Sequence, residues 1–435
     1  MIPAIILFAL TYVLMLTFSK YRPYIALASG VIFIVTGMLP VNGILASLDF
    51  NVLLMIAGTM GLVQLFIDSK MPALLADAIM AKVPNVQWAA VCLSLFAGVI
   101  SAFVDNVATV LMIAPVALEI CRKLKTNPVP FIIGIAVSSN LQGAATLVGD
   151  TTAIMLGSAL DMTFMDFFWY LGKPSIFFAV ELGAVISAFI LYMIFRKEKA
   201  PIPKNGDTTK VEDYVPTILL VGTIGLLVCA SFAPDSWNLP AEINGLICCA
   251  LLLVGLVYSF LRNKNLSAIT GPLKAIDFET LGLLVGLFLM IGGMEACGVI
   301  GALGNLLAGM GGNGLFLLFT VIVWASVLIS AFIDNIPYVA TMIPVIGSLA
   351  ATLAPELGVD AATLGVPLYF GLLSGATLGG NCTPIGASAN ITGIGILRRE
   401  GYQVKNSDFF KIGIPFTLAA IIPAYIYIWL IYGVS

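Results

Sequence analysis

Apolar stretches recur along the whole chain at the length of a membrane-spanning helix. A helix needs about 20 mostly apolar residues to cross the hydrocarbon core of a bilayer. Stretches close to that length lie at 3–19, 24–40, 51–67, 130–157, 168–195, 215–233, 242–261, 278–300, 365–396 and 412–432. The pattern predicts an all-α, polytopic membrane protein.

Two further apolar stretches, 87–120 and 314–350, contain an Asp-Asn pair near their middle. Each half of these stretches is short for a complete crossing. We therefore expect two re-entrant hairpins, which enter and leave the membrane on the same side and carry Asp105-Asn106 and Asp334-Asn335 at their tips.

The basic residues predict how the chain is oriented. With the N-terminus outside, every Lys and Arg except Lys173 falls on the cytoplasmic side, as the positive-inside rule requires. The outer loops expected at 41–48, 234–241, 301–313 and 351–364 contain no Lys or Arg. We expect a multi-pass protein of the cytoplasmic (inner) membrane with the lipid bilayer as its main partner.

Composition removes several classes of function. Only 10% of the residues are charged and mean hydropathy is +1.07, which argues against a water-soluble enzyme. A net charge of −3 without a basic block makes nucleic acid an improbable partner. The chain has no His, and its seven Cys show no C-x-x-C spacing, so we expect them to pack between helices and expect no cofactor beyond a coupling Na⁺ or H⁺.

The two halves of the chain resemble each other. The tip segments are identical at half of their positions, Asp and Asn included, and shorter matches lie upstream and downstream in the same order. The matched pairs are 101–116 with 330–345, 48–53 with 276–281, and 145–152 with 376–383. The collinear order predicts an internal repeat.

The polar linker 196–214 divides these repeats into 1–195 and 215–435. Each repeat would contain five spans and one hairpin. Because an odd number of crossings inverts the second copy, the two hairpins would enter from opposite faces. Inverted repeats with interrupted helices are typical of secondary transporters, whose substrate site lies near the midplane.

The hairpin tips carry candidate ion or substrate ligands. An ionised side chain at membrane depth is costly and needs a partner, an ion or water, and we expect no Lys, Arg or His in the core beside these tips. The alternative role, capping of the following helix, is compatible with ion binding. The candidates at the two tips are Ser101, Asp105, Asn106 and Thr109, and Ser330, Asp334 and Asn335.

Gly, Pro and hydroxyl residues interrupt the spans 130–157 and 365–396, which predicts two broken helices whose ends can bind ions. The candidates in these breaks are Asn140, Gly149, Asp150, Thr151, Thr152, Thr377, Gly380, Asn381 and Thr383. We expect Na⁺ ligands among Asp105, Asn106, Asp150, Asp334 and Asn335, because carboxylate and amide oxygens suit hard cations.

At these residues the chain resembles the ion transporter superfamily, in particular the ArsB/NhaD and citrate-transporter-like permeases. The similar segments are FVDN, AFIDNIPYVATMIPV, AATLVGD and LGGNCTPIGASAN. The resemblance implies an elevator-type homodimer with a scaffold domain and a mobile transport domain. Sodium-coupled dicarboxylate relatives carry Ser-Asn-Thr at each tip, whereas this chain has Asp105-Asn106-Val107 and Asp334-Asn335-Ile336, which moves the resemblance toward NhaD, arsenite pumps and the pigmentation P protein.

The leading hypothesis is cation-coupled secondary transport, best described as Na⁺/H⁺ antiport. The alternatives are Na⁺-coupled symport of a carboxylate or other anion, and efflux of arsenite or antimonite. An intramembrane aspartyl protease would leave the repeat and the third acid, Asp150, unexplained. A passive channel would be excluded by a flux that accumulates substrate against its gradient. A soluble ATPase partner remains open, although the chain itself has no P-loop motif.

Overall fold

The computed structural model describes residues 1–202, 209–310 and 314–433, so part of the linker expected at 196–214 and part of the outer loop expected at 301–313 lie outside the described residues. The first half contains α1 (Ile2–Thr17), η1 (Ser19–Tyr21), α2 (Arg22–Val35), η2 (Val41–Gly43), α3 (Ile44–Ser47), α4 (Phe50–Asp68), α5 (Met71–Met80), α6 (Val86–Ser101), α7 (Asn106–Leu124), α8 (Val129–Gly143), α9 (Thr151–Ala159), η3 (Met165–Phe167) and α10 (Ile176–Ile194).

The second half contains α11 (Val215–Ser231), η4 (Asp235–Trp237), α12 (Ile243–Asn263), α13 (Ser267–Ala275), α14 (Phe278–Ala296), α15 (Val299–Met310), α16 (Leu315–Ser330), α17 (Asn335–Leu357), α18 (Ala361–Gly379), η5 (Gly380–Cys382), α19 (Ser388–Arg399) and α20 (Asn406–Tyr432). Two short antiparallel strands, β1 (Trp169–Tyr170) and β2 (Lys173–Pro174), precede α10. The prediction for 168–195 assigned these first residues to a helix, and Gly172 at φ +74° permits the tight turn instead.

The chain is long and apolar enough to cross a membrane several times. Among the described residues seven helices meet that requirement, or up to nine if each of two bent helix pairs counts as one span. One bent pair is α1 with the segment 19–35, which turn by 116°. The stretches 3–19 and 24–40 therefore form helices of 16 and 14 residues, each short for an independent crossing.

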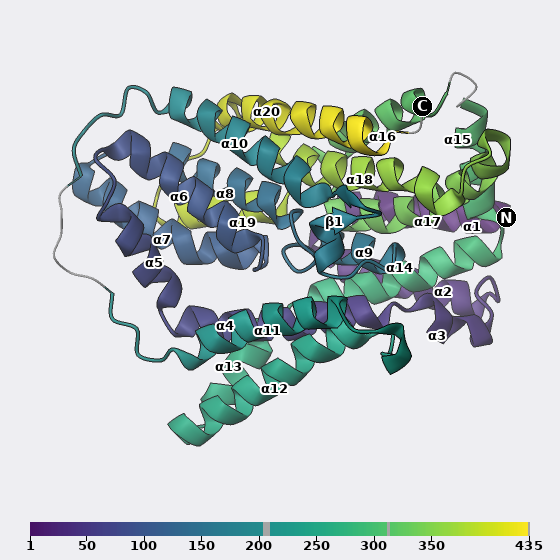
Figure 1. The fold of residues 1–435 in the computed structure, drawn as a ribbon, viewed down its shortest axis with the longest axis horizontal. Helices are drawn as coiled ribbons and strands as arrows, with labels where there is room; N and C mark the ends of the chain where they lie inside the picture. Colours follow the sequence, from purple (N-terminus) through teal and green to yellow (C-terminus); the bar gives the residue numbers. More distant parts are fainter. Residues whose placement is uncertain (203–208, 311–313, 434–435) are drawn as a thin grey trace.

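The helices form two layers (Figure 1). The lower layer in that view contains α4, α11, α12 and α13, and the upper layer contains α6, α8, α10, α18 and α20. Within the layers α4 packs against α12, α10 against α20, α6 against α8, and α16 against α18, while α2 packs against α14. The closest pairings thus join helices of the first half to helices of the second half as well as neighbours in sequence.

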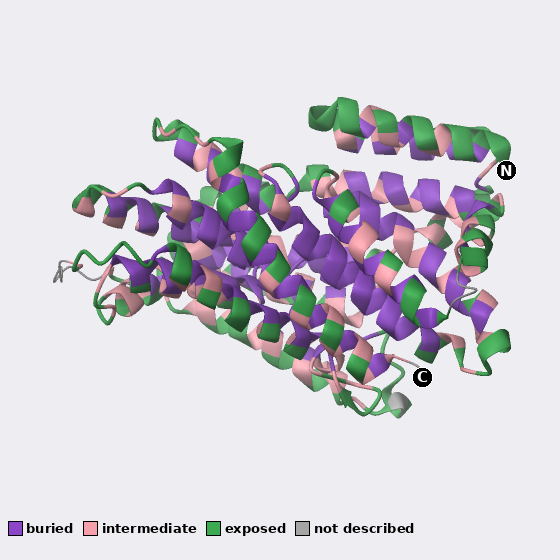
Figure 2. Ribbon diagram, turned by 90° about the horizontal axis from the view of Figure 1, so that it is seen from above, coloured by how far each residue is buried: buried purple, intermediate pink, exposed green. Residues whose placement is uncertain are grey.

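Burial is concentrated in α8 and α18. Every residue of α8 from Phe131 to Gly143 is buried, as is every residue of α18 from Leu364 to Gly379. Figure 2 shows this buried centre surrounded by helices whose outer faces are exposed. Those faces carry large apolar side chains such as Phe189, Leu253 and Leu430, as expected for helices that face lipid tails.

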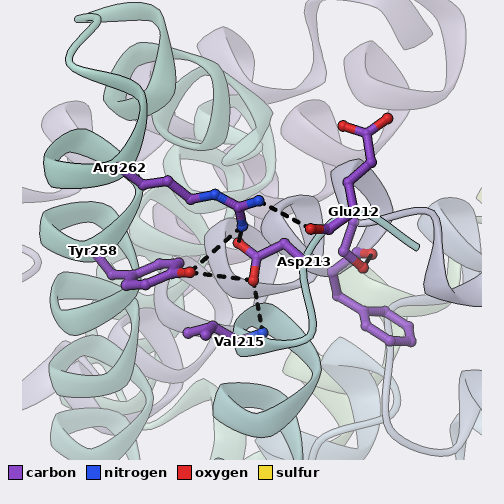
Figure 3. A network of polar contacts seen from close by, with 7 residues as sticks. Glu212, Asp213, Val215, Tyr258 and Arg262 are labelled. Carbon is purple, nitrogen blue, oxygen red and sulfur yellow. Dashed lines mark hydrogen bonds and ion pairs between the residues drawn. The ribbon is translucent and has the colours of Figure 1, made fainter. Parts of the chain in front are cut away.

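Polar contacts fasten the end of the linker to the lower layer (Figure 3). Asp213 pairs with Arg262 of α12, accepts a hydrogen bond from the Tyr258 hydroxyl at 3.3 Å, and caps α11 through the Val215 N–H at 2.9 Å. The neighbouring Glu212 binds Lys70 at 2.9 Å, and this hydrogen bond and positive charge lower the pKa of the Glu212 carboxyl.

Candidate functional site

The first Asp-Asn pair lies where α6 turns into α7. Asp105 precedes α7, and its Oδ2 accepts hydrogen bonds from the N–H groups of Val107 at 3.0 Å and Ala108 at 3.1 Å. Asp suits this position because its side chain satisfies donors that the first helical turn leaves free. Capping uses one carboxylate oxygen and fixes the direction of the other.

The second pair lies in the same way where α16 turns into α17. Asp334 accepts from the N–H of Ile336 at 3.2 Å through Oδ1. Its Oδ2 lies 3.1 Å from Nη1 of Arg22, the first residue of α2. The expectation that no basic side chain would lie beside the tips was therefore wrong for Asp334, because a long side chain from the α1–α2 corner reaches it.

Each tip is fastened to the broken helix of its own half. The Thr146 hydroxyl, in the break between α8 and α9, donates to the carbonyl of Ala102, and the Thr383 hydroxyl, after α18, donates to the carbonyl of Ala331. Gly149 and Gly386 lie so close to the tips that an added Cβ would approach the carbonyl oxygens of Ser101 and Ser330 to 2.7 and 2.9 Å.

These contacts correct the expected match between residues 145–152 and 376–383. The structural counterpart of Thr146 is Thr383, not Thr377, because both breaks carry the same Gly-x-x-Thr-x-x-Gly pattern, at 143–149 and 380–386. Helices α17 and α18 have 23 and 19 residues where α7 and α8 have 19 and 15, so a comparison without gaps loses register. Asp150 consequently corresponds to Ala387 and has no acidic counterpart.

Three buried polar side chains, Asn106, Asn140 and Asn381, join the two broken helices. Asn140 donates from Nδ2 to Oδ1 of Asn381 at 3.1 Å and to the carbonyl of Thr377 at 2.7 Å. Its Oδ1 accepts from Nδ2 of Asn106 at 3.1 Å. Asn381 in turn donates to the Val137 carbonyl at 2.9 Å. This network positions the first tip relative to both breaks.

A cavity of about 270 Å³ lies beside the first tip. It brings together the expected residues Asp105, Asn106, Asp150, Thr151 and Asn335. Sequence reasoning missed four further polar lining residues: Gln64 of α4, Asp277 and Thr280 at the start of α14, and Ser388 at the start of α19. Asp277 could have been found, since it belongs to one of the matched segments, 276–281.

Asp150 lies at the N-terminus of α9, immediately before its first residue. Asp150 is 4% exposed, and its Oδ2 accepts a hydrogen bond from the Thr152 hydroxyl at 2.8 Å. Thr152 also shares a hydrogen bond with Thr377 at 3.2 Å. The Asp150 side chain accepts no hydrogen bond from the backbone N–H groups at the start of α9. Thr152, which is itself bonded to Thr377, therefore orients the Asp150 carboxylate, and neither threonine lines the cavity that Asp150 lines.

Other expected residues do not line this cavity. Ser101 accepts from Ser139 at 3.1 Å, Ser330 donates to the Ala376 carbonyl at 2.5 Å, and Thr109 is fully buried. Asp334 lines a neighbouring cavity of about 480 Å³ together with Arg22 and Asp277. Within the described residues no three Asp, Glu, Cys or His side chains are close enough to hold one metal ion.

Comparison with known proteins agrees with this architecture. The sequence profile of the citrate transporter family matches residues 12–369. An uncharacterized transporter of Mycobacterium tuberculosis is 32% identical over 346 residues, which are 79% of this chain and 77% of that protein. The human P protein is 26% identical over 85% of this chain and 52% of its own length.

A solved structure shares the fold. The YdaH transporter of Alcanivorax borkumensis superposes with a TM-score of 0.61 at 13% identity, covering 89% of this chain and 87% of that one. The resemblance to citrate-transporter-like permeases is thus confirmed, as is the prediction of a multi-pass membrane transporter. The chain belongs to the citrate transporter family.

Proposed function

We propose that this secondary transporter couples movement of its substrate to a small monovalent cation, with Na⁺/H⁺ exchange as its leading activity. The observation that carries this proposal is the lining of the 270 Å³ cavity, where Asp105, Asp150 and Asp277 occur with neutral amide and hydroxyl groups and without a Lys or Arg. Carboxylate, amide and hydroxyl oxygens together favour a hard cation over an anion.

Competition at one carboxylate is sufficient for exchange. Asp105 and Asp150 each have one oxygen engaged by a helix or a hydroxyl donor and one oxygen free of hydrogen bonds from the described residues. A carboxylate in a confined site takes up either a proton or a metal cation, since both neutralise the same charge. A protein that reorients only when this charge is neutralised exchanges the two ions.

The two halves would form inverted repeats, and the upper layer would move as an elevator against the lower one. The arrangement of the cavity supports this, since α4 and α14 contribute one wall and the breaks and tips contribute the other. Ala275 in the lining follows Lys274, which the charge pattern assigns to the cytoplasm, so this cavity would open toward the cytoplasm. A separate cavity of about 900 Å³, with Asp49, Asp161, Glu242 and Glu295 in its lining, would be the outer vestibule of an inner-membrane homodimer.

The test is ion exchange in proteoliposomes that enclose a pH-sensitive dye. Addition of Na⁺ or Li⁺ outside the vesicles should alkalinise the lumen with the wild type, because the entering cation is exchanged for a proton that leaves. Asp105→Asn and Asp150→Asn should each reduce this response at least tenfold. Glu119→Gln is the matched control, since Glu119 is exposed and pairs only with Lys123 of its own helix. An undiminished response in both Asp variants would overturn the proposal.

Coupled carboxylate uptake is the second candidate. Helix α19 begins at Ser388 without a side-chain cap, and Ser388 lines the cavity together with Asn335. Free N–H groups at a helix N-terminus favour an anion. Uptake of radiolabelled citrate that requires Na⁺, and that falls in Ser388→Ala, would favour symport; dye responses to Na⁺ without citrate uptake would favour exchange.

A further inference from the structure

The corner between α1 and α2 holds the tip of the second hairpin. Arg22 contacts Asp334 at 3.1 Å and donates from Nε to the Met15 carbonyl at 3.3 Å. Tyr12 donates to the Pro337 carbonyl at 2.6 Å and shares a hydrogen bond with Thr341 at 2.5 Å. Two side chains of the corner therefore bind the start of α17.

In the part of the chain that the structure describes, the first hairpin has no equivalent ion-pair partner. In helix order α11 and α12 correspond to α1 and α2, but α12 begins at Ile243 after Glu242, and both residues line the 900 Å³ cavity. Among the described residues the ion pairs include Arg22 with Asp334 and none with Asp105. The two tip acids are thus in unequal surroundings, although their sequences match.

We propose that Arg22 is the resident counter-cation of Asp334 and takes the place that a transported cation would occupy. In this conformation only Asp105 of the two tip acids is then open to a cation. If the second tip moves away from the corner, Asp334 loses the guanidinium and becomes able to bind Na⁺. This inference rests on the proposed function, to which it adds a coupling residue and an order of cation binding at the two tips.

The physical reason is the cost of an unpaired charge in a confined place. The side chains of Arg22 and Asp334 are only 22% and 15% exposed. Removing one member of such a pair leaves the other without a partner, whereas removing both leaves no charge to satisfy. A small cation that binds the folded protein stabilises it, and a carboxylate left without its guanidinium offers such a binding site.

The test measures the thermal midpoint of purified protein in Na⁺ and in choline. All variants carry Asp105→Asn and Asp150→Asn, so that Na⁺ binding at the first tip and at the start of α9 does not contribute. Arg22→Gln should lower the midpoint in choline by roughly 3 °C, and Na⁺ should restore most of that loss. Arg22→Lys, which keeps the positive charge, and Arg22→Gln/Asp334→Asn, which has no bare acid, should show no such Na⁺ response.

Equal Na⁺ responses in Arg22→Gln and in the double variant would overturn the inference. Asp334→Asn provides a second check that does not depend on the folding of Arg22→Gln: with Arg22 already at the carboxylate, this substitution should leave the Na⁺ response unchanged, and a reduced response would contradict the proposal. These readouts do not require transport. A wild type without cation-driven flux would refute the proposed function alone.

Discussion

Asn140 of α8 donates a hydrogen bond of 3.1 Å to Asn381, the second residue after the end of α18 in the other half of the chain. Both side chains are fully buried. The two broken helices are consequently connected by side chains at the point where each has lost its regular backbone hydrogen bonds, so their ends are positioned together.

Replacing Asn140 by Leu should destabilise the protein strongly. The substitution keeps the approximate volume but leaves the Asn106 side-chain amide, the Thr377 backbone carbonyl and Oδ1 of Asn381 without their partner. A buried polar group without a partner costs about 1–3 kcal/mol, so we expect a loss of at least about 3 kcal/mol. The thermal midpoint in detergent measures this loss.

Asn305→Leu is the matched control for Asn140→Leu. Asn305 accepts one exposed hydrogen bond, from Thr352. Its substitution should change stability by less than about 0.5 kcal/mol. Equal shifts in the two variants would show that the Asn140 network does not stabilise the breaks.

Gly149→Ala should displace the first tip and abolish transport while leaving the protein in the membrane. The added methyl group would lie 2.5 Å from the Gly143 carbonyl oxygen and 2.7 Å from that of Ser101. Ser101 ends α6 just before the turn that carries Asp105, so we expect this turn to shift. Gly225→Ala in α11 is the control, since nothing lies within 4 Å of its added Cβ. Ion flux at matched expression measures the effect, and normal flux in Gly149→Ala would contradict the tight approach.

The sequence predicted the features that disturb an apolar pattern. Asp105 and Asp334, and the Gly- and Thr-rich breaks, were recognisable because polar residues inside apolar stretches need a reason. Arg22 was not predicted beside Asp334, since more than 300 residues separate them and contact depends on how the α1–α2 corner packs. The counterpart of Thr146 was misassigned because two longer helices shift the second half.

Thr152→Val should weaken cation binding without unfolding the protein. Valine keeps the shape of threonine but removes the hydroxyl that donates to Asp150 at 2.8 Å. A hydrogen bond to a charged group contributes about 1.5–3 kcal/mol and favours the ionised carboxylate over its protonated form. Without it protons compete better with Na⁺, so the half-maximal Na⁺ concentration should rise roughly tenfold. Thr36→Val, at an exposed hydroxyl that bonds only its own helix, is the control. An unchanged Na⁺ dependence would remove Asp150 from the proposed site.

Asp213 should matter more to the linker than its neighbour Glu212. Asp213 is 17% exposed and holds Arg262, Tyr258 and the start of α11, so Asp213→Ala should lower the thermal midpoint by roughly 2–4 °C.

Glu212 pairs in solvent with Lys70, and such pairs contribute little. Because Lys70 lowers the pKa of Glu212, any stabilisation is present above the pKa of the unfolded chain, about 4.3, and is lost only as pH falls through the lower folded value. The thermal midpoint of Glu212→Gln should therefore equal that of the wild type at every pH between 8 and 6. A shift larger than that of Asp213→Ala would contradict the geometry in Figure 3.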